Sequence, residues 1–97
     1  MEIAQIRYFI AICRERSFTA AAKSCGVSQP TLSIAIKALE QELGQPLFER
    51  KPRIQLTDFG RRIHPHLRHI IDAVETVAAM AAADSMETPV RRVVGQR

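Results

Sequence analysis

The segment 28–43 constrains the fold most strongly, because apolar residues recur along it at the spacing of a helix. Ser28 is a suitable N-cap, and Pro30 is compatible with a helix start because the N–H that it lacks would have no intrahelical partner. Gly44 can adopt the left-handed conformation that ends a helix. The apolar residues, at spacings of four, three and four, predict one buried stripe: Leu32, Ile36, Leu39 and Leu43.

A shorter helical segment precedes this helix, and a turn that contains glycine joins the two. We expect that helix at 18–24, capped by Ser17, with Gly26 taking a positive φ in the turn. The three alanines 20–22 have little bulk, so a second helix can cross them closely. A short helix, a turn with glycine and a capped second helix predict a helix-turn-helix over residues 18–37.

Two further segments complete this unit. Residues 1–16 are predicted to form a first helix, whose apolar residues share one face. The alternating segments 47–50 and 53–56 predict a two-stranded hairpin over residues 47–56. Beside a helix-turn-helix, such a hairpin is typical of a wing, whose cations reach phosphates or a narrow minor groove. The alternative is a solvated turn whose cations bind no ligand. These cations are Arg50, Lys51 and Arg53.

A long helix is predicted over residues 58–83, capped by Thr57 and kinked by Pro65 near Arg61. Its length would be about 39 Å, too long for its apolar seam to be buried on so small a unit. We expect the seam to form a dimer interface with the same helix of a second chain; the alternative is a helix folded back on its own domain. The seam residues are Ile63, Leu67, Ile70, Val74, Val77 and Ala81.

Composition and charge narrow the classes of function. The net charge of +4 and the pI of about 9.7 favour an anionic partner, of which nucleic acid is the usual one. The sequence contains no run of about 18 apolar residues, so we predict no helix that spans a membrane. The start of the chain lacks a signal pattern and the two cysteines are isolated, so we expect a cytoplasmic chain with reduced thiols.

The sequence offers no pattern typical of catalysis. It has no nucleophile–base pair, no carboxylate pair and no glycine-rich phosphate loop, so we predict no enzyme and no cofactor. Three histidines fall within 64–69, but only His66 and His69 share a helix face, and no acidic or thiol ligand lies nearby in sequence. We therefore predict no metal site.

The residues expected to read DNA bases lie at the start of the helix 28–43. The amide of Gln29 can pair with adenine, and Pro30 and Thr31 can contact thymine methyl groups. Ser33 can reach a phosphate or a base. For Ile34 two interpretations stay open, a thymine methyl contact that favours A·T-rich DNA or packing at the edge of the core.

Other residues are expected to bind the DNA backbone. Cations set affinity rather than sequence preference. Ser17 and Thr19 can present hydroxyl or backbone N–H groups to a phosphate, although simple helix capping is the alternative for both. The complete predicted set of DNA-contacting residues is Ser17, Thr19, Ser28, Gln29, Pro30, Thr31, Ser33, Ile34, Lys37, Arg50, Lys51 and Arg53.

Several motifs in one register resemble the N-terminal DNA-binding domain of LysR-type transcriptional regulators. The motifs are FTAAA, VSQPTLS, IKALE, LGQPLFER and LTDFG, between Phe18 and Gly60. The resemblance implies a mainly α fold, a winged helix-turn-helix of three helices and a two-stranded hairpin, followed by a long dimerisation helix. It also implies a bacterial, nucleoid-associated transcription factor that binds double-stranded DNA at interrupted inverted repeats near promoters, as a homodimer or tetramer.

The resemblance suggests three parts: residues 1–57 as the DNA-binding domain, 58–83 as the linker helix, and 84–97 as a tail. Family members usually continue into an effector-binding domain, and the end of the chain, VRRVVGQR, resembles its first strand. We therefore expect a piece of a longer protein, without a small-molecule effector site of its own. The alternative function is a sensor-less interaction protein that pairs with a full-length regulator and antagonises it.

The sequence departs from the family pattern at three places. Ile34, followed by Ala35, stands where the family commonly has arginine, so no phosphate or guanine contact is carried over to this position. Cys25 stands where leucine is common. The wing is about one residue shorter than usual, which bears on the reach of Arg53.

Overall fold

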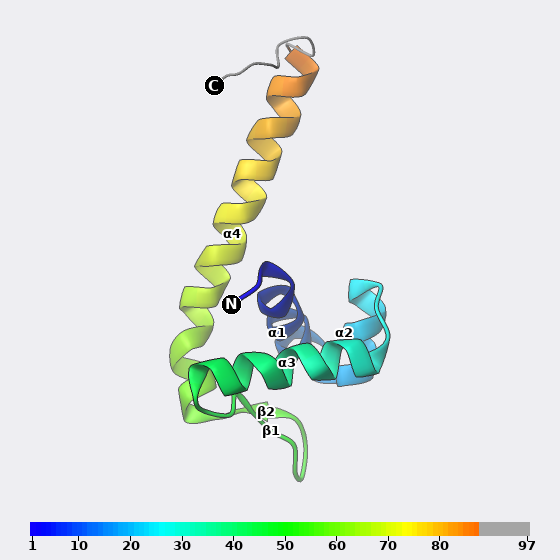
Figure 1. Ribbon diagram of the computed structural model, residues 1–97, viewed down its shortest axis with the longest axis vertical. Coiled ribbons are helices and arrows are strands. Elements are labelled where there is room, and N and C mark those ends of the chain that lie inside the picture. Colours follow the sequence, from blue (N-terminus) through cyan, green and yellow to red (C-terminus); the bar gives the residue numbers. More distant parts are fainter. Residues whose placement is uncertain (88–97) are drawn as a thin grey trace.

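The computed structural model describes residues 1–87 as helices and one small antiparallel sheet. Figure 1 shows α1, α2 and α3 gathered at one end of the molecule, with α4 extending from them along the long axis. The molecule measures 54 × 25 × 19 Å because α4 projects so far. The elements are α1 (Ile3–Glu15), α2 (Phe18–Cys25), α3 (Gln29–Leu43), β1 (Phe48–Glu49), β2 (Gln55–Leu56) and α4 (Asp58–Glu87).

Side-chain caps begin the two helices of the helix-turn-helix where the sequence predicts them. The hydroxyl of Ser17 accepts a hydrogen bond from the N–H of Ala20 at 3.0 Å. The hydroxyl of Ser28 accepts one from the N–H of Thr31 at 3.2 Å. Each cap satisfies a backbone N–H that has no partner inside its helix.

Left-handed residues end the first three helices. Gly26 and Gly44 have φ of 73° and 80°, and Arg16 adopts φ 56° after α1. Glycine adopts this conformation without a steric penalty, which confirms the predicted roles of both glycines. Cys25 is the last residue of α2 rather than part of the turn, because Gly26 is the residue that leaves the helix.

The core lies between α1 and α3 and is closed by the hairpin and α4. Phe9 of α1 is completely buried, and the ring of Phe48 packs against it from the start of the hairpin. The predicted stripe of α3 is confirmed. Its first three members are fully buried and the fourth is half-buried: Leu32, Ile36, Leu39 and Leu43.

The hairpin is shorter than predicted. Phe48 pairs with Leu56 and Glu49 with Gln55, so each strand has two residues instead of four. At the base, the N–H of Leu47 donates to the carboxylate of Glu40 instead of to the other strand, and beyond Glu49 the ladder stops before the tip. Residues 51–53 therefore form a bend at the tip.

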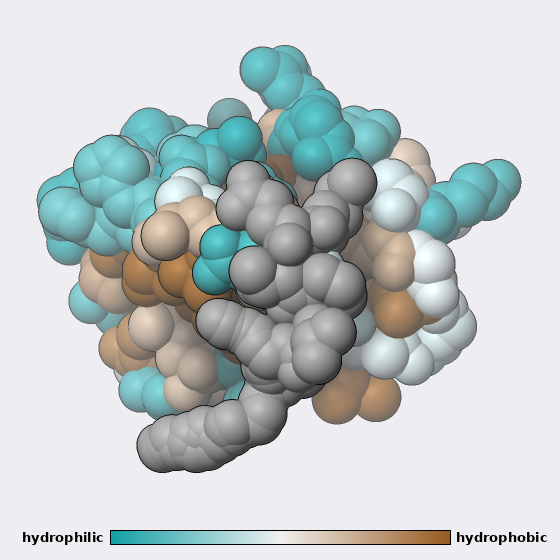
Figure 2. All heavy atoms as spheres, turned by 90° about the horizontal axis from the view of Figure 1, so that it is seen from above, coloured by the Kyte–Doolittle hydropathy of each residue, from teal (hydrophilic) through white to brown (hydrophobic). Residues whose placement is uncertain are grey.

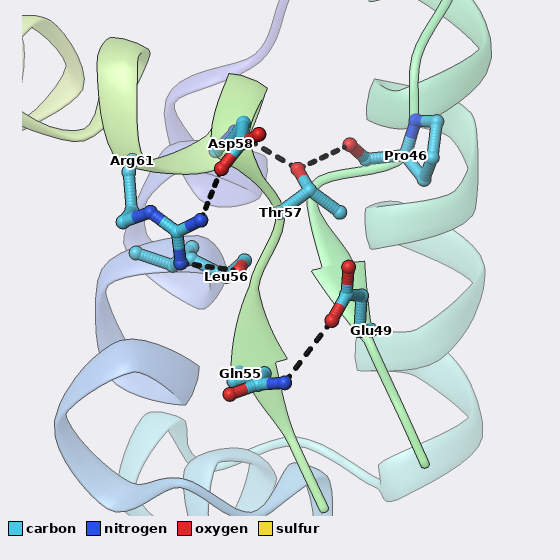
Figure 3. A network of polar contacts seen from close by, with 8 residues as sticks. Pro46, Glu49, Gln55, Leu56, Thr57, Asp58 and Arg61 are labelled. Atoms are coloured by element: carbon cyan, nitrogen blue, oxygen red, sulfur yellow. Dashed lines mark hydrogen bonds and ion pairs between the residues drawn. The ribbon is translucent and has the colours of Figure 1, made fainter.

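Thr57 joins the base of the hairpin to the start of α4 (Figure 3). Its hydroxyl donates to the carbonyl of Pro46 at 2.8 Å and accepts the N–H of Gly60 at 2.9 Å, which confirms the predicted cap. Arg61 donates to the carbonyl of Leu56 at 3.0 Å and pairs with Asp58. Gly60 lies so close to the hairpin that an added Cβ would be 2.5 Å from the Leu47 carbonyl oxygen.

α4 extends to Glu87, four residues beyond the predicted end at Ala83. The prediction stopped where the apolar stripe stopped, but a helix can extend past the end of its stripe where the residues are good helix formers. The helix runs through Pro65, and Figure 1 shows its axis changing direction in its first turns. Residues 88–97, which contain most of the predicted tail, lie outside the described residues.

The predicted seam of α4 is divided in two, which corrects the expectation of one dimer interface. Leu67 is only 4% exposed because it packs against the core of its own chain, as does Ile71. Ile63 and Ile70 are half-buried against the same core. Val77, by contrast, is 65% exposed, and Ala81 is exposed too. The first half of the helix is therefore folded onto its own domain.

Candidate nucleic-acid interface

The face of α3 that points away from the core carries the predicted base-reading residues. Gln29, Thr31 and Lys37 are exposed and Ser33 is half-buried, so none of them belongs to the core. Ile34 is 71% exposed, which rules out packing at the edge of the core. The structure therefore leaves a largely polar surface, on which Pro30 and Ile34 are exposed apolar residues.

Hydrogen bonds within the first turns of α3 orient these polar groups. The Nε2 of Gln29 donates to the Oγ of Ser33 at 2.5 Å. The amide oxygen and the second N–H of Gln29 remain available, and these are the groups that pair with adenine. The hydroxyl of Ser28 is used locally, because it also donates to the Oγ1 of Thr31 at 2.9 Å. Ser28 is thus first of all a cap.

A groove separates α3 from β1, and cations lie along it. Its volume is about 660 Å³, and its walls include Ser33 and Lys37 on one side and Arg50 on the other. The groove also contains Glu40, whose carboxylate accepts the N–H groups of Leu47 at 2.7 Å and Phe48 at 3.4 Å. These two hydrogen bonds hold the carboxylate of Glu40 against the base of the hairpin.

The other two cations of the hairpin are not among the residues that line this groove. Lys51 is exposed in the bend at the tip. Arg53 lies beside a second hollow of about 280 Å³, between the end of α1 and β2, together with Arg16 and Arg61. The structure therefore brings Arg50 to the α3 face, while Arg53 lies along the wing and does not line that groove.

Sequence reasoning missed Phe18, the first residue of α2. The guanidinium carbon of Arg50 lies 4.4 Å from the centre of the Phe18 ring. Ser17, on one side of Phe18, acts as a cap and is half-buried, and Thr19, on the other side, is exposed. No sequence pattern relates positions 18 and 50, because they belong to separate elements that meet only in the fold.

Cys13 and His64 are both partly buried. Burial raises the pKa of Cys13 to about 11, so this thiol is protonated at neutral pH and unreactive. The ring of His64 packs 5.8 Å from that of Phe9. Within residues 1–87, no three histidine, cysteine, aspartate or glutamate side chains are grouped to hold a metal ion. The same residues include no helix that is long and apolar enough to cross a membrane.

Residues 3–61 match the family described as bacterial regulatory helix-turn-helix protein, lysR family. The chain belongs to the LysR family. Residues 3–61 are therefore the helix-turn-helix DNA-binding domain of a LysR-family chain, and its winged, mainly helical fold agrees with the resemblance that the motifs indicated.

The curated relatives of this LysR-family chain are transcriptional regulators. It is 52% identical over 65 residues to the regulator BudR of Klebsiella aerogenes, over 66% of this chain and 46% of the relative. It is 39% identical over 94 residues to IlvR of Caulobacter vibrioides, over 96% of this chain and 29% of the relative. The chain thus spans less than half the length of these two relatives.

Solved LysR-family structures share the fold. The DNA-binding domain of CbnR in complex with DNA is 36% identical with a TM-score of 0.77, over 88% of this chain and 99% of that one. The DNA-binding domain of BenM with catB site 1 DNA is 34% identical with a TM-score of 0.80, over 88% of this chain and 97% of that one. Both matched structures are DNA complexes.

Proposed function

We propose that this LysR-family chain binds double-stranded DNA sequence-specifically as a dimer, and thereby regulates transcription from inverted repeats near promoters. In this proposal α3 lies in the major groove and the wing reaches the adjacent backbone or minor groove. The observation that supports it most is the shared groove in which Ser33 and Lys37 of α3 face Arg50 of the wing. The DNA complexes formed by its structural relatives support the same assignment.

The proposed division of labour follows from the chemistry of the exposed groups. Gln29 reads adenine through its free amide oxygen and N–H, while its contact with Ser33 restricts its rotation. Lys37 and Arg50 bind phosphates and set affinity. The exposed Ile34 contacts a thymine methyl group, which makes A·T base pairs favourable at one position.

Dimerisation is proposed through the outer half of α4, the part that contains Val77, Met80 and Ala81. Val77 and Met80 are 65% and 63% exposed there. Figure 2, which views the molecule from above, shows hydrophobic side chains in brown at the surface of the described residues, among hydrophilic ones in teal. Clustered exposed apolar residues mark interaction sites in soluble proteins. A tetramer, sensing of an effector, and a cytoplasmic, nucleoid-associated location are proposed only for the whole protein.

Selection of bound duplexes from a random pool tests the proposal. A dimer is expected to return two half-sites in inverted order, separated by a fixed spacing. Binding should weaken steeply with salt, with a log–log slope of several units. If the pool is recovered without any enriched sequence, the proposed sequence-specific function is wrong.

Substitution of Gln29 tests the base-reading role. Gln29→Ala is expected to weaken binding to the selected duplex by about 1–3 kcal/mol, and to leave binding to random duplex nearly unchanged. Gln45→Ala is the matched control, because Gln45 is an exposed glutamine beyond the end of α3. An equal loss on both duplexes would mean that Gln29 does not read a base.

The role of Ile34 can be tested by changing either the DNA base or the side chain in the proposed contact. Uracil in place of thymine removes only the methyl group, so a duplex with uracil at the contacted position should bind more weakly. The Ile34→Ala chain should bind the thymine and uracil duplexes equally well, because the partner of the methyl group is gone. If the intact chain shows no preference for thymine at any selected position, Ile34 has no methyl contact.

A further inference from the structure

Arg50 is held by an aromatic ring and not by an opposite charge. Its guanidinium carbon lies over the ring of Phe18, 4.4 Å from the ring centre. Among the described residues, Arg50 makes no hydrogen bond or ion pair, so the N–H donors of its guanidinium are free for a ligand. A ring face attracts a cation without using these donors.

Two further aromatic rings hold the Phe18 ring in place. Phe18 is 9% exposed, and its ring meets that of Phe48 edge to face at 5.8 Å. Phe48 in turn packs 5.5 Å from the ring of Phe9, which is completely buried. The three rings connect Arg50 to the centre of the core, so the platform beneath the guanidinium is rigid.

The position of Arg50 matters for the proposed DNA contact. The same side chain lines the groove in which Ser33 and Lys37 of α3 lie. A free arginine side chain loses considerable rotamer freedom when it binds a phosphate. An arginine that already rests on a fixed ring loses less, so its phosphate contact is stronger.

We propose that Phe18 is a positioning residue for DNA binding: it holds the guanidinium of Arg50 at the α3 groove, ready to bind a backbone phosphate. Phe18 itself does not touch DNA. This inference rests on the proposed function and adds a residue of α2 to it. It also assigns Arg50 to the interface of α3, apart from Lys51 and Arg53 of the wing.

The test compares variants of the full chain on the selected duplex and on random duplex. Phe18→Leu keeps an apolar side chain but removes the ring, and it should weaken binding two- to fivefold on both duplexes, because a phosphate contact is independent of sequence. Arg50→Ala should lower the log–log salt slope by about one. Phe18→Leu should cause no further loss when Arg50 is already alanine.

Two controls separate positioning from folding. A fluorinated phenylalanine at position 18 keeps the shape of the ring but weakens its negative face, so it should reduce affinity without changing the melting temperature. Phe59→Leu removes a comparable pair in α4, where the guanidinium carbon of Arg62 lies 5.8 Å from the ring centre. Phe59→Leu should leave affinity unchanged in chains that are folded at the assay temperature.

The outcomes distinguish the two proposals. If the unaltered chain enriches no sequence, the proposed function fails. If it does enrich one and Arg50→Ala weakens binding, but the fluorinated ring leaves affinity unchanged, only the positioning role of Phe18 is overturned. Full additivity of the Phe18→Leu and Arg50→Ala losses would also overturn it.

Discussion

The two halves of α4 have similar apolar spacing but different surroundings. In the inner half, Leu67 and Ile71 are each 4% exposed because α1 and the core lie against them. In the outer half, Val77 and Met80 are 65% and 63% exposed because the rest of the described chain does not reach that far. Apolar spacing therefore predicts that a helix has a face to bury, but it does not identify the surface that buries it.

The difference also separates stability from assembly. Burial of a side chain such as that of Leu67 stabilises the fold by about 1.5–3 kcal/mol. The outer half makes no comparable contribution within one chain, so its apolar residues are expected to act only when a second molecule covers them. Substitutions in the inner half should consequently change the free energy of unfolding, and substitutions in the outer half should change the dissociation constant of the dimer.

Leu67→Ala should have the largest effect on the free energy of unfolding. Removing a fully packed leucine side chain leaves a cavity, and such changes typically cost about 2–5 kcal/mol. Chemical denaturation followed by circular dichroism measures the loss. Val77→Ala is the control in the outer half and should change the stability of the isolated chain by less than about 0.5 kcal/mol. Equal losses would contradict the division of the helix.

The double substitution Val77→Asp and Met80→Asp should disrupt the proposed self-association. Charges in an apolar interface are costly, so we expect the dissociation constant of the dimer to rise at least 100-fold, or about 2.7 kcal/mol. Sedimentation equilibrium measures it. Thr76→Asp adds a negative charge to an exposed position outside the predicted seam and should have a much smaller effect. A dimer that persists in the double variant would place the interface elsewhere.

Gly60→Ala should destabilise the junction between the inner half and the hairpin. The new methyl group would lie 2.5 Å from the Leu47 carbonyl oxygen and 2.9 Å from the Cδ2 of Leu56, so the backbone must shift. The expected cost is about 1–3 kcal/mol in thermal or chemical unfolding. Ser85→Ala introduces the same residue at an exposed position of the outer half, where stability should stay within about 0.5 kcal/mol.

Arg68→Ala should have the smallest effect. The Nε of Arg68 lies 3.5 Å from the Oδ1 of Asp72, and both side chains are about half exposed, so solvent screens the pair. A double-mutant cycle with Asp72→Ala should give a coupling of a few tenths of a kcal/mol that shrinks in high salt. A coupling above about 1 kcal/mol would show that the pair is more than a surface contact.

The features that the sequence predicted well depend on neighbouring residues. The limits of α3 follow from the cap at Ser28 and the left-handed Gly44, which are local events. The Arg68–Asp72 pair is local in the same sense, because it needs only one turn of helix.

The features that the sequence missed depend on distant parts of the chain. The burial of Leu67 depends on where α1 lies, and the contact between Phe18 and Arg50 depends on the packing of α2 against the hairpin. The hairpin is shorter than predicted because Glu40 of α3 accepts the N–H of Leu47, and alternation along the chain gives no signal of this contact. The DNA-contacting residues themselves remain predictions. Each of them is at least partly exposed, as a DNA contact requires.

Thr57 gives the molecule a mechanical property. Its hydroxyl bonds the loop before β1 to the first turn of α4, and its N–H donates to the carbonyl of Leu47 at 2.9 Å. A change in the direction of α4 would therefore move the base of the hairpin with it, because one residue joins the two by three hydrogen bonds.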